Sequence, residues 1–421
     1  MTHMNTRVFD YKEHRLKNGI NLVSIKRDTR LFCINIGINI GAINEKISEK
    51  GICHFIEHML FKGTKKRDNN QINYDLEKCG GNYDAYTNYT STVFSVTALA
   101  EELESSVEVL SDILINSTFP KNELEKERGV ILSEIKSCID DIEDYSFSKV
   151  HSLAFEKSPL KYDVIGSEKN IKMFTRKQLL KFYKENYIPS RCIIAVVSPY
   201  EHDKIKEIIE RYFGDWNNKT VGKKKEVIIT ERNKSIEKIS YKNNIEQNTL
   251  IYLYTFYGLT REEEIALDIL NHKLGVSANS ILFRALREER GLAYDIYSEM
   301  DATEFIKTLY IYTAVEESNV WEAKKIIEES IEKIKNRKII LEEKDINLMK
   351  KIIKTSIAAI LEDSSGLCNY ALNQKLMNKR IDGFIEDLKK LDYISVEDIY
   401  KVAQKVLIEP TVHILMNKKA D

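Results

Sequence analysis

Two long segments of the chain combine apolar and charged residues at helical spacing. Residues 123–141 (ELEKERGVILSEIKSCIDD) and 341–363 each open with charged residues, and apolar residues then recur three or four positions apart. Side chains at these intervals share one helix face, so each segment predicts an amphipathic helix. Runs rich in β-branched and aromatic residues predict strands at 18–28, 30–43, 80–99 and 248–258.

The two halves of the chain resemble each other. Glu125-Lys126-Glu127 matches Glu343-Lys344-Asp345 at an offset of 218 residues, and residues 170–198 match 386–417 at an offset of about 220. The second pair of segments predicts a helix, a turn containing proline and an apolar strand in each half. Two similarities at nearly one offset predict a duplicated domain of roughly 210 residues.

The sequence therefore predicts an α+β fold made of two homologous αβ domains, each with a mixed or antiparallel sheet covered by helices. The expected division is a first domain at 1–215, a linker at 216–238 and a second domain at 239–421. A chain of 421 residues is long enough for two cores.

Composition narrows the class of protein. Hydrophobic residues make up 43% and charged residues 31%, which is typical of a globular chain. The net charge of −1 favours neither nucleic acid nor an anionic membrane as partner. No signal peptide, transit peptide or long apolar segment is evident, so we expect a cytoplasmic protein. The six cysteines include no C-x-x-C pair, and free thiols are expected.

One short motif carries chemistry. The run GICHFIEHMLFKGT places His54, Glu57 and His58 in an H-x-x-E-H pattern within an apolar, helix-compatible stretch. On a helix, His58 lies about 40° and Glu57 about 60° from His54, so all three side chains leave one face. Two imidazoles there can bind a metal and a carboxylate can act as a base, as in zinc hydrolases. Taken alone, the pattern fits a pair of structural histidines equally well.

A catalytic zinc site needs a third protein ligand from another element. Glu134 is the candidate, 76 residues after His58 on the helix predicted at 123–141. Glu127 precedes Glu134 by two helical turns and points the same way. It can therefore hold a ligand imidazole in its tautomer, or fix the side of the site where substrate binds. The alternative for both is a solvated charged helix face, as we expect for Glu123 and Glu125.

With these residues in place, HFIEHMLFKGTKKR and ELEKERGVILSEI resemble the pitrilysin-type zinc metallopeptidases, in the short-subunit branch that includes the mitochondrial processing peptidase and bacterial relatives. The resemblance covers nearly the whole chain. It implies His54, His58 and Glu134 as zinc ligands, Glu57 as general base and one Zn²⁺ per active subunit. It also implies a clam-shell arrangement of the two domains.

A second part of the resemblance lies in LFRALREERGLAYDIYS. There the family uses an Arg and a Tyr seven residues apart to hold substrate and the oxyanion of the reaction, which implies these roles for Arg287 and Tyr294. The alternatives are a surface charge and a core aromatic. The resemblance further implies that the strand with Ala85 and Tyr86 binds a peptide substrate as an added β-strand.

Several positions depart from the family pattern. Asp84 stands where an Asn is usual, and Asn88 and Thr90 replace a Ser and a Glu, which leaves substrate selection open. Cys53 replaces the usual small residue before the first His. Non-catalytic partner subunits of the family can carry a glycine-rich loop before the segment that holds the Arg and the Tyr. The corresponding run here, LGVSANSILF, has only Gly275, which argues against that role.

These observations predict a zinc-dependent endopeptidase for short or unfolded peptides. Family members of this length imply a homodimer or a heterodimer with a related subunit, and no nucleic acid or membrane partner is expected. Two alternatives stay open. One is a non-catalytic structural or assembly subunit of the same fold, and the other is a dedicated leader-peptide maturation protease in a biosynthetic cluster.

Overall fold

The chain forms two compact units, each built from separated segments. The computed structural model describes residues 9–217 and 228–418. The first unit draws on Met1–Ile135, Asp163–Val227 and Ala358–Gly383. The second draws on Lys136–Tyr162, Ile228–Ile357 and Phe384–Asp421.

The first unit contains a six-stranded mixed sheet. Its strands are β1 (Asp10–Arg15), β2 (Asn21–Lys26), β3 (Leu31–Ile38), β4 (Asn82–Thr87), β5 (Thr92–Leu99) and β6 (Cys192–Ser198). They lie in the order β1-β2-β6-β3-β5-β4, and only β2 and β6 pair in parallel. The central strand β6 is buried along its whole length, which explains its uninterrupted apolar sequence. Strand β4 forms one edge of the sheet.

Helices cover one face of this sheet around a large apolar core. They are α1 (Ile52–Leu60), α2 (Asn69–Lys78), α3 (Leu103–Asn116), most of α4 (Lys121–Asp140), α6 (Glu168–Met173), α7 (Arg176–Asn186) and α8 (His202–Phe213). Phe55, Ile113 and Ile131 from three of these helices meet Ile34 and Phe94 of the sheet, and all five are fully buried.

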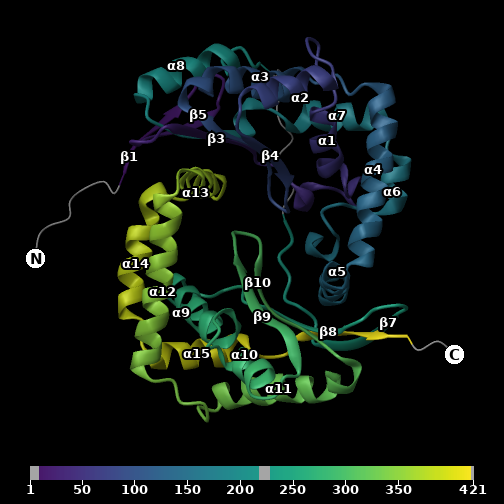
Figure 1. The fold of residues 1–421 in the computed structure, drawn as a ribbon, viewed down its shortest axis with the longest axis vertical. Helices are drawn as coiled ribbons and strands as arrows, with labels where there is room; N and C mark the ends of the chain where they lie inside the picture. The colour runs from purple at the N-terminus through teal and green to yellow at the C-terminus, as the bar shows by residue number, and fades with distance from the viewer. Residues whose placement is uncertain (1–8, 218–227, 419–421) are drawn as a thin grey trace, which may run out of the picture. The chain divides into compact units, whose positions relative to one another are not determined.

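The opposite face of the first sheet is covered by α13 (Ser364–Leu376), which comes from the second half of the sequence (Figure 1). Leu367, Cys368 and Leu372 of α13 are buried against Val23 of β2 and other sheet residues. The approach is close, because a Cβ at Gly37 of β3 would lie 3.0 Å from Cδ1 of Leu372.

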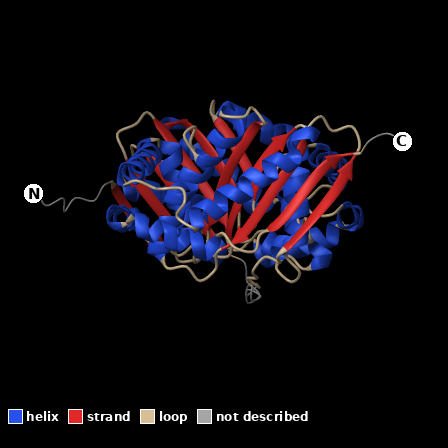
Figure 2. Ribbon diagram, turned by 90° about the horizontal axis from the view of Figure 1, so that it is seen from below, coloured by secondary structure: helices blue, strands red, loops and turns tan. Residues whose placement is uncertain are grey.

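The second unit repeats the order of five of these strands, and no strand equivalent to β1 lies among its described residues. Its strands are β7 (Ile236–Lys242), β8 (Asn248–Thr255), β9 (Ala293–Ala302), β10 (Lys307–Val315) and β11 (Thr411–Asn417). They lie in the order β7-β11-β8-β10-β9, with only β7 and β11 parallel among them. Figure 2 shows the strands of the chain in red and its helices in blue. Five strands of the first unit follow the same order, so the predicted α+β duplication is confirmed.

Helices also cover the second sheet. They are α9 (Arg261–Asn271), α10 (Ile281–Phe283), α11 (Val320–Lys335), most of α12 (Glu343–Glu362), α14 (Phe384–Tyr393) and α15 (Val396–Val406). The other face is covered by α5 (Ile142–Ala154), from the first half of the sequence. His151 of α5 contacts the Tyr310 hydroxyl at 2.7 Å, and Ser146 contacts Thr249.

The compact units thus differ from the continuous domains expected at 1–215 and 239–421, because each sheet takes a covering helix from the other half of the sequence. The expected linker at 216–238 lies partly outside the described residues, and its last residues, from Ile236, belong to β7.

Two further findings bear on the sequence predictions. The strand expected at 80–99 is a hairpin, with β4 and β5 joined at Asn88–Ser91. In the part of the chain that the structure describes, no helix is long and apolar enough to span a bilayer, and the cysteines are free thiols.

Candidate metal centre and catalytic groups

The H-x-x-E-H motif forms helix α1, as its pattern predicts. Ile52, Phe55, Ile56, Met59 and Leu60 face the core of the first unit and are almost fully buried. They recur at intervals of three and four residues, which turns one face of the helix inward. The two histidines leave a different face and keep partial access to solvent, with side-chain exposures of 18% and 17%.

Helix α4 brings Glu134 to both histidines. Its Oε2 lies 3.9 Å from Nε2 of His54 and 3.6 Å from Nε2 of His58. One ligand atom from each residue can be chosen so that all three lie within 4.8 Å of one another. The structure therefore brings together the three residues that the sequence analysis assigned to a metal.

The donor set fits a zinc ion. Ligand atoms about 2 Å from a tetrahedral ion lie about 3.3 Å apart, and the Glu134 oxygen lies 3.6 and 3.9 Å from the two imidazole nitrogens. Two imidazoles and one carboxylate also form a donor set that catalytic zinc sites use.

His58 is oriented by Glu127. Nδ1 of His58 lies 3.0 Å from Oε2 of Glu127. The other carboxylate oxygen of Glu127, Oε1, lies 3.0 Å from Nζ of Lys62. Burial raises the pKa of Glu127, but the bonds from His58 and Lys62 outweigh burial and lower it overall. Glu127 is thus an ionised acceptor, which favours a proton on Nδ1 of His58 and leaves Nε2 as the nitrogen that faces Glu134.

His54 lacks such a partner. Its Nδ1 is buried and has no hydrogen bond among the described residues. Burial, assisted by the neighbouring His58, lowers the pKa of His54 to about 4. A neutral imidazole at physiological pH is the form that binds a metal. The orientation of the His54 ring therefore depends on the helix backbone that carries it.

Glu57 lies one turn along α1 and is 8% exposed. The hydroxyl of Thr87, at the end of β4, donates to its Oε2 at 2.8 Å. Burial raises the pKa of Glu57, and the charges of Asp84 and Glu134 act in the same direction. A carboxyl group of raised pKa is suited to taking up and returning a proton. Thr87 could not be identified from the sequence, since a Thr in a strand carries no distinctive signal.

The edge strand β4 holds Ala85 and Tyr86, both half-buried on opposite faces of the sheet. Ala85 packs on the helix-covered face. The Tyr86 hydroxyl lies 3.5 Å from Oδ1 of Asn369 on α13. Within the described residues no strand pairs with the outer edge of β4, so its backbone groups are open to an added strand.

The departures from the family pattern have distinct structural roles. Asn88 shapes the β4–β5 turn, because its Oδ1 accepts from the backbone N–H groups of Thr90 and Ser91 at 2.8 and 2.7 Å. Asp84 is exposed on the edge strand. Cys53 is fully buried, and burial raises the pKa of its thiol, which opposes thiolate chemistry.

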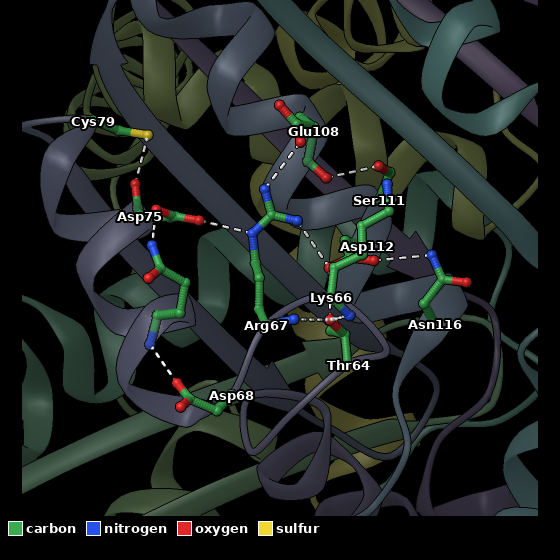
Figure 3. Close-up of polar contacts among 11 residues, drawn as sticks. Thr64, Lys66, Arg67, Asp68, Asp75, Cys79, Glu108, Ser111, Asp112 and Asn116 are labelled. Carbon is green, nitrogen blue, oxygen red and sulfur yellow. Dashed lines mark hydrogen bonds and ion pairs between the residues drawn. The ribbon is translucent and has the colours of Figure 1, made fainter.

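Arg67 fixes the loop that leaves the carboxyl end of α1. Its guanidinium reaches Asp75 on α2 at 2.7 Å, and Glu108 and Asp112 on α3 at 2.9 Å each (Figure 3). Thr64 of the same loop donates to Asp112 at 2.7 Å. The guanidinium is 12% exposed, so it serves as a structural anchor for the motif helix.

Arg287 and Tyr294 lie in the second unit and contact each other. Arg287 belongs to a π-helical turn, Arg284–Glu288, and donates from Nη1 to the Tyr294 backbone oxygen at 3.0 Å. Its guanidinium carbon lies 5.2 Å from the centre of the Tyr294 ring, which is largely exposed. The two residues thus form a solvent-facing pair of donors, and their action on the metal centre stays a prediction.

Fold and donor set are those of a duplicated metallopeptidase, and comparison with known proteins agrees. Residues 22–168 match the model of "Insulinase (Peptidase family M16)" and residues 173–353 that of "Peptidase M16 inactive domain". The chain belongs to the M16 peptidase family, which confirms the predicted resemblance. The part that matches the inactive-domain model contains Arg287 and Tyr294 but none of the metal donors.

Relatives of this chain are named as zinc proteases. It is 28% identical to the uncharacterized zinc protease YmxG of Bacillus subtilis, over 94% of this chain and 96% of YmxG. An uncharacterized zinc protease of Rickettsia felis is 31% identical, over 71% of this chain and 73% of the relative. A protease structure from Helicobacter pylori has the same fold, with a TM-score of 0.88 at 20% identity, over 98% of this chain and 100% of that one.

Proposed function

We propose that this chain is a zinc-dependent endopeptidase that hydrolyses peptides or unfolded polypeptide segments. The observation that carries the proposal is the set of His54, His58 and Glu134 donors within 4.8 Å of one another, with the buried Glu57 on the same helix. The names of the relatives support zinc as the metal.

The roles follow from the contacts of each side chain. His54, His58 and Glu134 hold the ion, and Glu127 keeps His58 in the tautomer that binds it. When bound, zinc supplies Lewis-acid chemistry that makes water a nucleophile near neutral pH. Glu57 takes a proton from the attacking water and returns it to the leaving amine, and Thr87 keeps one of its oxygens in place.

The substrate is proposed to add as a strand to the free edge of β4, beside Ala85 and Tyr86. Main-chain pairing of this kind requires an extended peptide, which favours short or unfolded substrates over folded ones. Arg287 and Tyr294 are proposed to donate hydrogen bonds to the carbonyl oxygen of the scissile bond as it gains charge. A homodimer or a heterodimer with a related subunit is part of the same proposal.

The test combines metal content with cleavage. Purified protein should hold about one zinc per chain by atomic spectroscopy and should cleave members of a quenched-peptide library. Glu57→Gln is the matched inactive control, because it preserves shape and removes the base. A chain that folds, binds no zinc and cleaves no peptide would instead be a non-catalytic subunit of the same fold.

A further inference from the structure

The amino end of α1 has an unusual cap. Gly51 occupies the N-cap position and has no side chain to accept from the first backbone N–H groups of the helix. The carboxylate of Glu45, six residues earlier, takes that role. Its Oε2 accepts from the N–H of Gly51 at 3.0 Å and its Oε1 from the N–H of Cys53 at 2.8 Å.

The local backbone explains why the cap is remote. Gly51 has φ = 94°, a conformation that side chains disfavour, and a Cβ there would lie 2.6 Å from the backbone oxygen of Ile165. The usual capping residues therefore do not fit at position 51. A carboxylate reaching in from the preceding loop satisfies two N–H groups that the helix leaves open.

Glu45 is buried, with an exposure of 6%. Burial raises its pKa to about 7, and the N–H groups of Cys53 and Gly51 and the charge of Lys50 act in the opposite direction. Lys50 is also buried and donates from Nζ to the Ala42 backbone oxygen at 2.6 Å. A buried carboxylate is costly, and here its two oxygens are directed at the turn that carries His54.

His54 depends on this turn more than His58 does. The ring of His58 is held by Glu127, whereas Nδ1 of His54 has no hydrogen bond among the described residues. The position of His54 Nε2 is therefore set by its rotamer and by the backbone directly after Cys53. Glu45 binds the N–H of that neighbouring residue.

We propose that Glu45 is a positioning residue of the metal centre, which holds the first turn of α1 and through it places the His54 donor atom opposite Glu134. The inference rests on the proposed function in taking the ion to be zinc. It assigns to the loop before the motif a role in metal affinity. Glu45 touches neither the ion nor the substrate.

The test uses the full chain with the substitution Glu45→Gln. In this variant one carboxylate oxygen is replaced by an amide NH₂, which cannot accept a hydrogen bond from the backbone N–H group that it faces. Glu77→Gln on α2 is the matched control, since Glu77 is exposed and lies in the same unit. Zinc affinity is measured by competition with a chelator well below the melting temperature, and backbone hydrogen exchange of residues 51–55 is measured without metal.

We expect Glu45→Gln to weaken zinc binding about tenfold or more, the scale seen for groups that orient metal ligands, and to accelerate exchange in the first turn of α1. Glu77→Gln should match wild type in both measurements. A Glu45→Gln protein that melts earlier but binds zinc with wild-type affinity would overturn the proposal, because its role would then be structural only.

If Glu45→Gln does not fold, the zinc affinity of Glu45→Asp tests the proposal instead. Its shorter side chain keeps the charge but cannot reach both N–H groups, so zinc affinity should fall between those of wild type and the metal-ligand variants. Wild-type zinc affinity in Glu45→Asp would overturn the proposal. Both readouts are independent of catalysis, so a wild-type chain that binds zinc and cleaves no peptide would contradict the proposed function and leave the role of Glu45 standing.

Discussion

The hydroxyl of Thr87 donates a 2.8 Å hydrogen bond to Oε2 of Glu57, which joins the end of edge strand β4 to the motif helix α1. This bond stabilises the ionised carboxylate against the effect of burial, which raises its pKa. The strand on which we propose that substrate pairs is thus in direct contact with the proposed base. A substitution in β4 can therefore alter the position or the pKa of Glu57 without altering the metal ligands.

Glu57→Gln should keep one zinc per chain and lose nearly all peptidase activity. The amide has the same shape but cannot accept the proton of water, a loss expected at about 10²- to 10⁴-fold. Zinc content by atomic spectroscopy and cleavage of a quenched peptide are measured on the same preparation. Loss of zinc from this variant would show that Glu57 is a ligand instead.

Glu134→Gln should weaken zinc binding itself. A neutral amide oxygen replaces the anionic donor that lies 3.6 Å from Nε2 of His58. The fall in affinity, measured by chelator competition, should exceed the roughly 10- to 100-fold typical of an outer partner. Glu123→Gln, on the same helix three turns before Glu134, is the control. Equal affinity in the two variants would remove Glu134 from the site.

Glu127→Gln should have an intermediate effect. The amide can still accept from Nδ1 of His58, but it lacks the charge that favours this tautomer and that pairs with Lys62. Zinc affinity or kcat/KM should fall about 10- to 100-fold. The variant is assayed beside Glu134→Gln, and a larger loss of affinity for Glu127→Gln would exchange the roles of the two carboxylates.

Arg287→Ala and Tyr294→Phe test whether the second unit takes part in catalysis. If both residues stabilise the oxyanion, each change should lower kcat/KM about 10²- to 10³-fold with zinc content unchanged. The double variant should show less than the product of the two effects, because Arg287 contacts Tyr294 directly. Wild-type kinetics in both folded single variants would limit the second unit to folding or assembly.

The pH dependence of activity should respond to Asp84. Burial raises the pKa of Glu57, and the charge of Asp84 also acts to raise it. The base works in its ionised form, so activity falls as the pH drops through this pKa. Asp84→Asn removes a negative charge, lowers the pKa of Glu57 and should move the acidic limb of kcat/KM to lower pH. Asp28→Asn, an exposed change elsewhere in the first unit, should leave that limb in place.

The local elements and the metal donors could be predicted from sequence because both depend on regular spacing. The period of α1 places His54 and His58 on one face, and that of α4 places Glu127 and Glu134 on one face. The duplication was also visible, since its two similarities share one offset. The spacing within each helix and the offset of the duplication can both be read without knowing which helices and sheets pack together.

The remaining features depend on packing between distant segments. The turn between β4 and β5 contains no Gly or Pro, and the side chain of Asn88 forms it by accepting from Thr90 and Ser91. Glu45 lies in a charged loop typical of a surface, and only the fold shows that it caps α1. Helix α13 has almost no amphipathic pattern, so neither its buried face nor the sheet that it covers could be predicted from its sequence.

That helix has a consequence for the order of synthesis. The apolar face of the first sheet, with Val23, Ile25 and Val197, is complete only when α13 packs on it. Residues 364–376 leave the ribosome after nearly all of the second sheet has been made. The nascent amino-terminal half therefore holds an exposed apolar surface for most of translation. A truncated chain that ends before α13 should be captured by chaperones or aggregate, although it contains every proposed metal ligand.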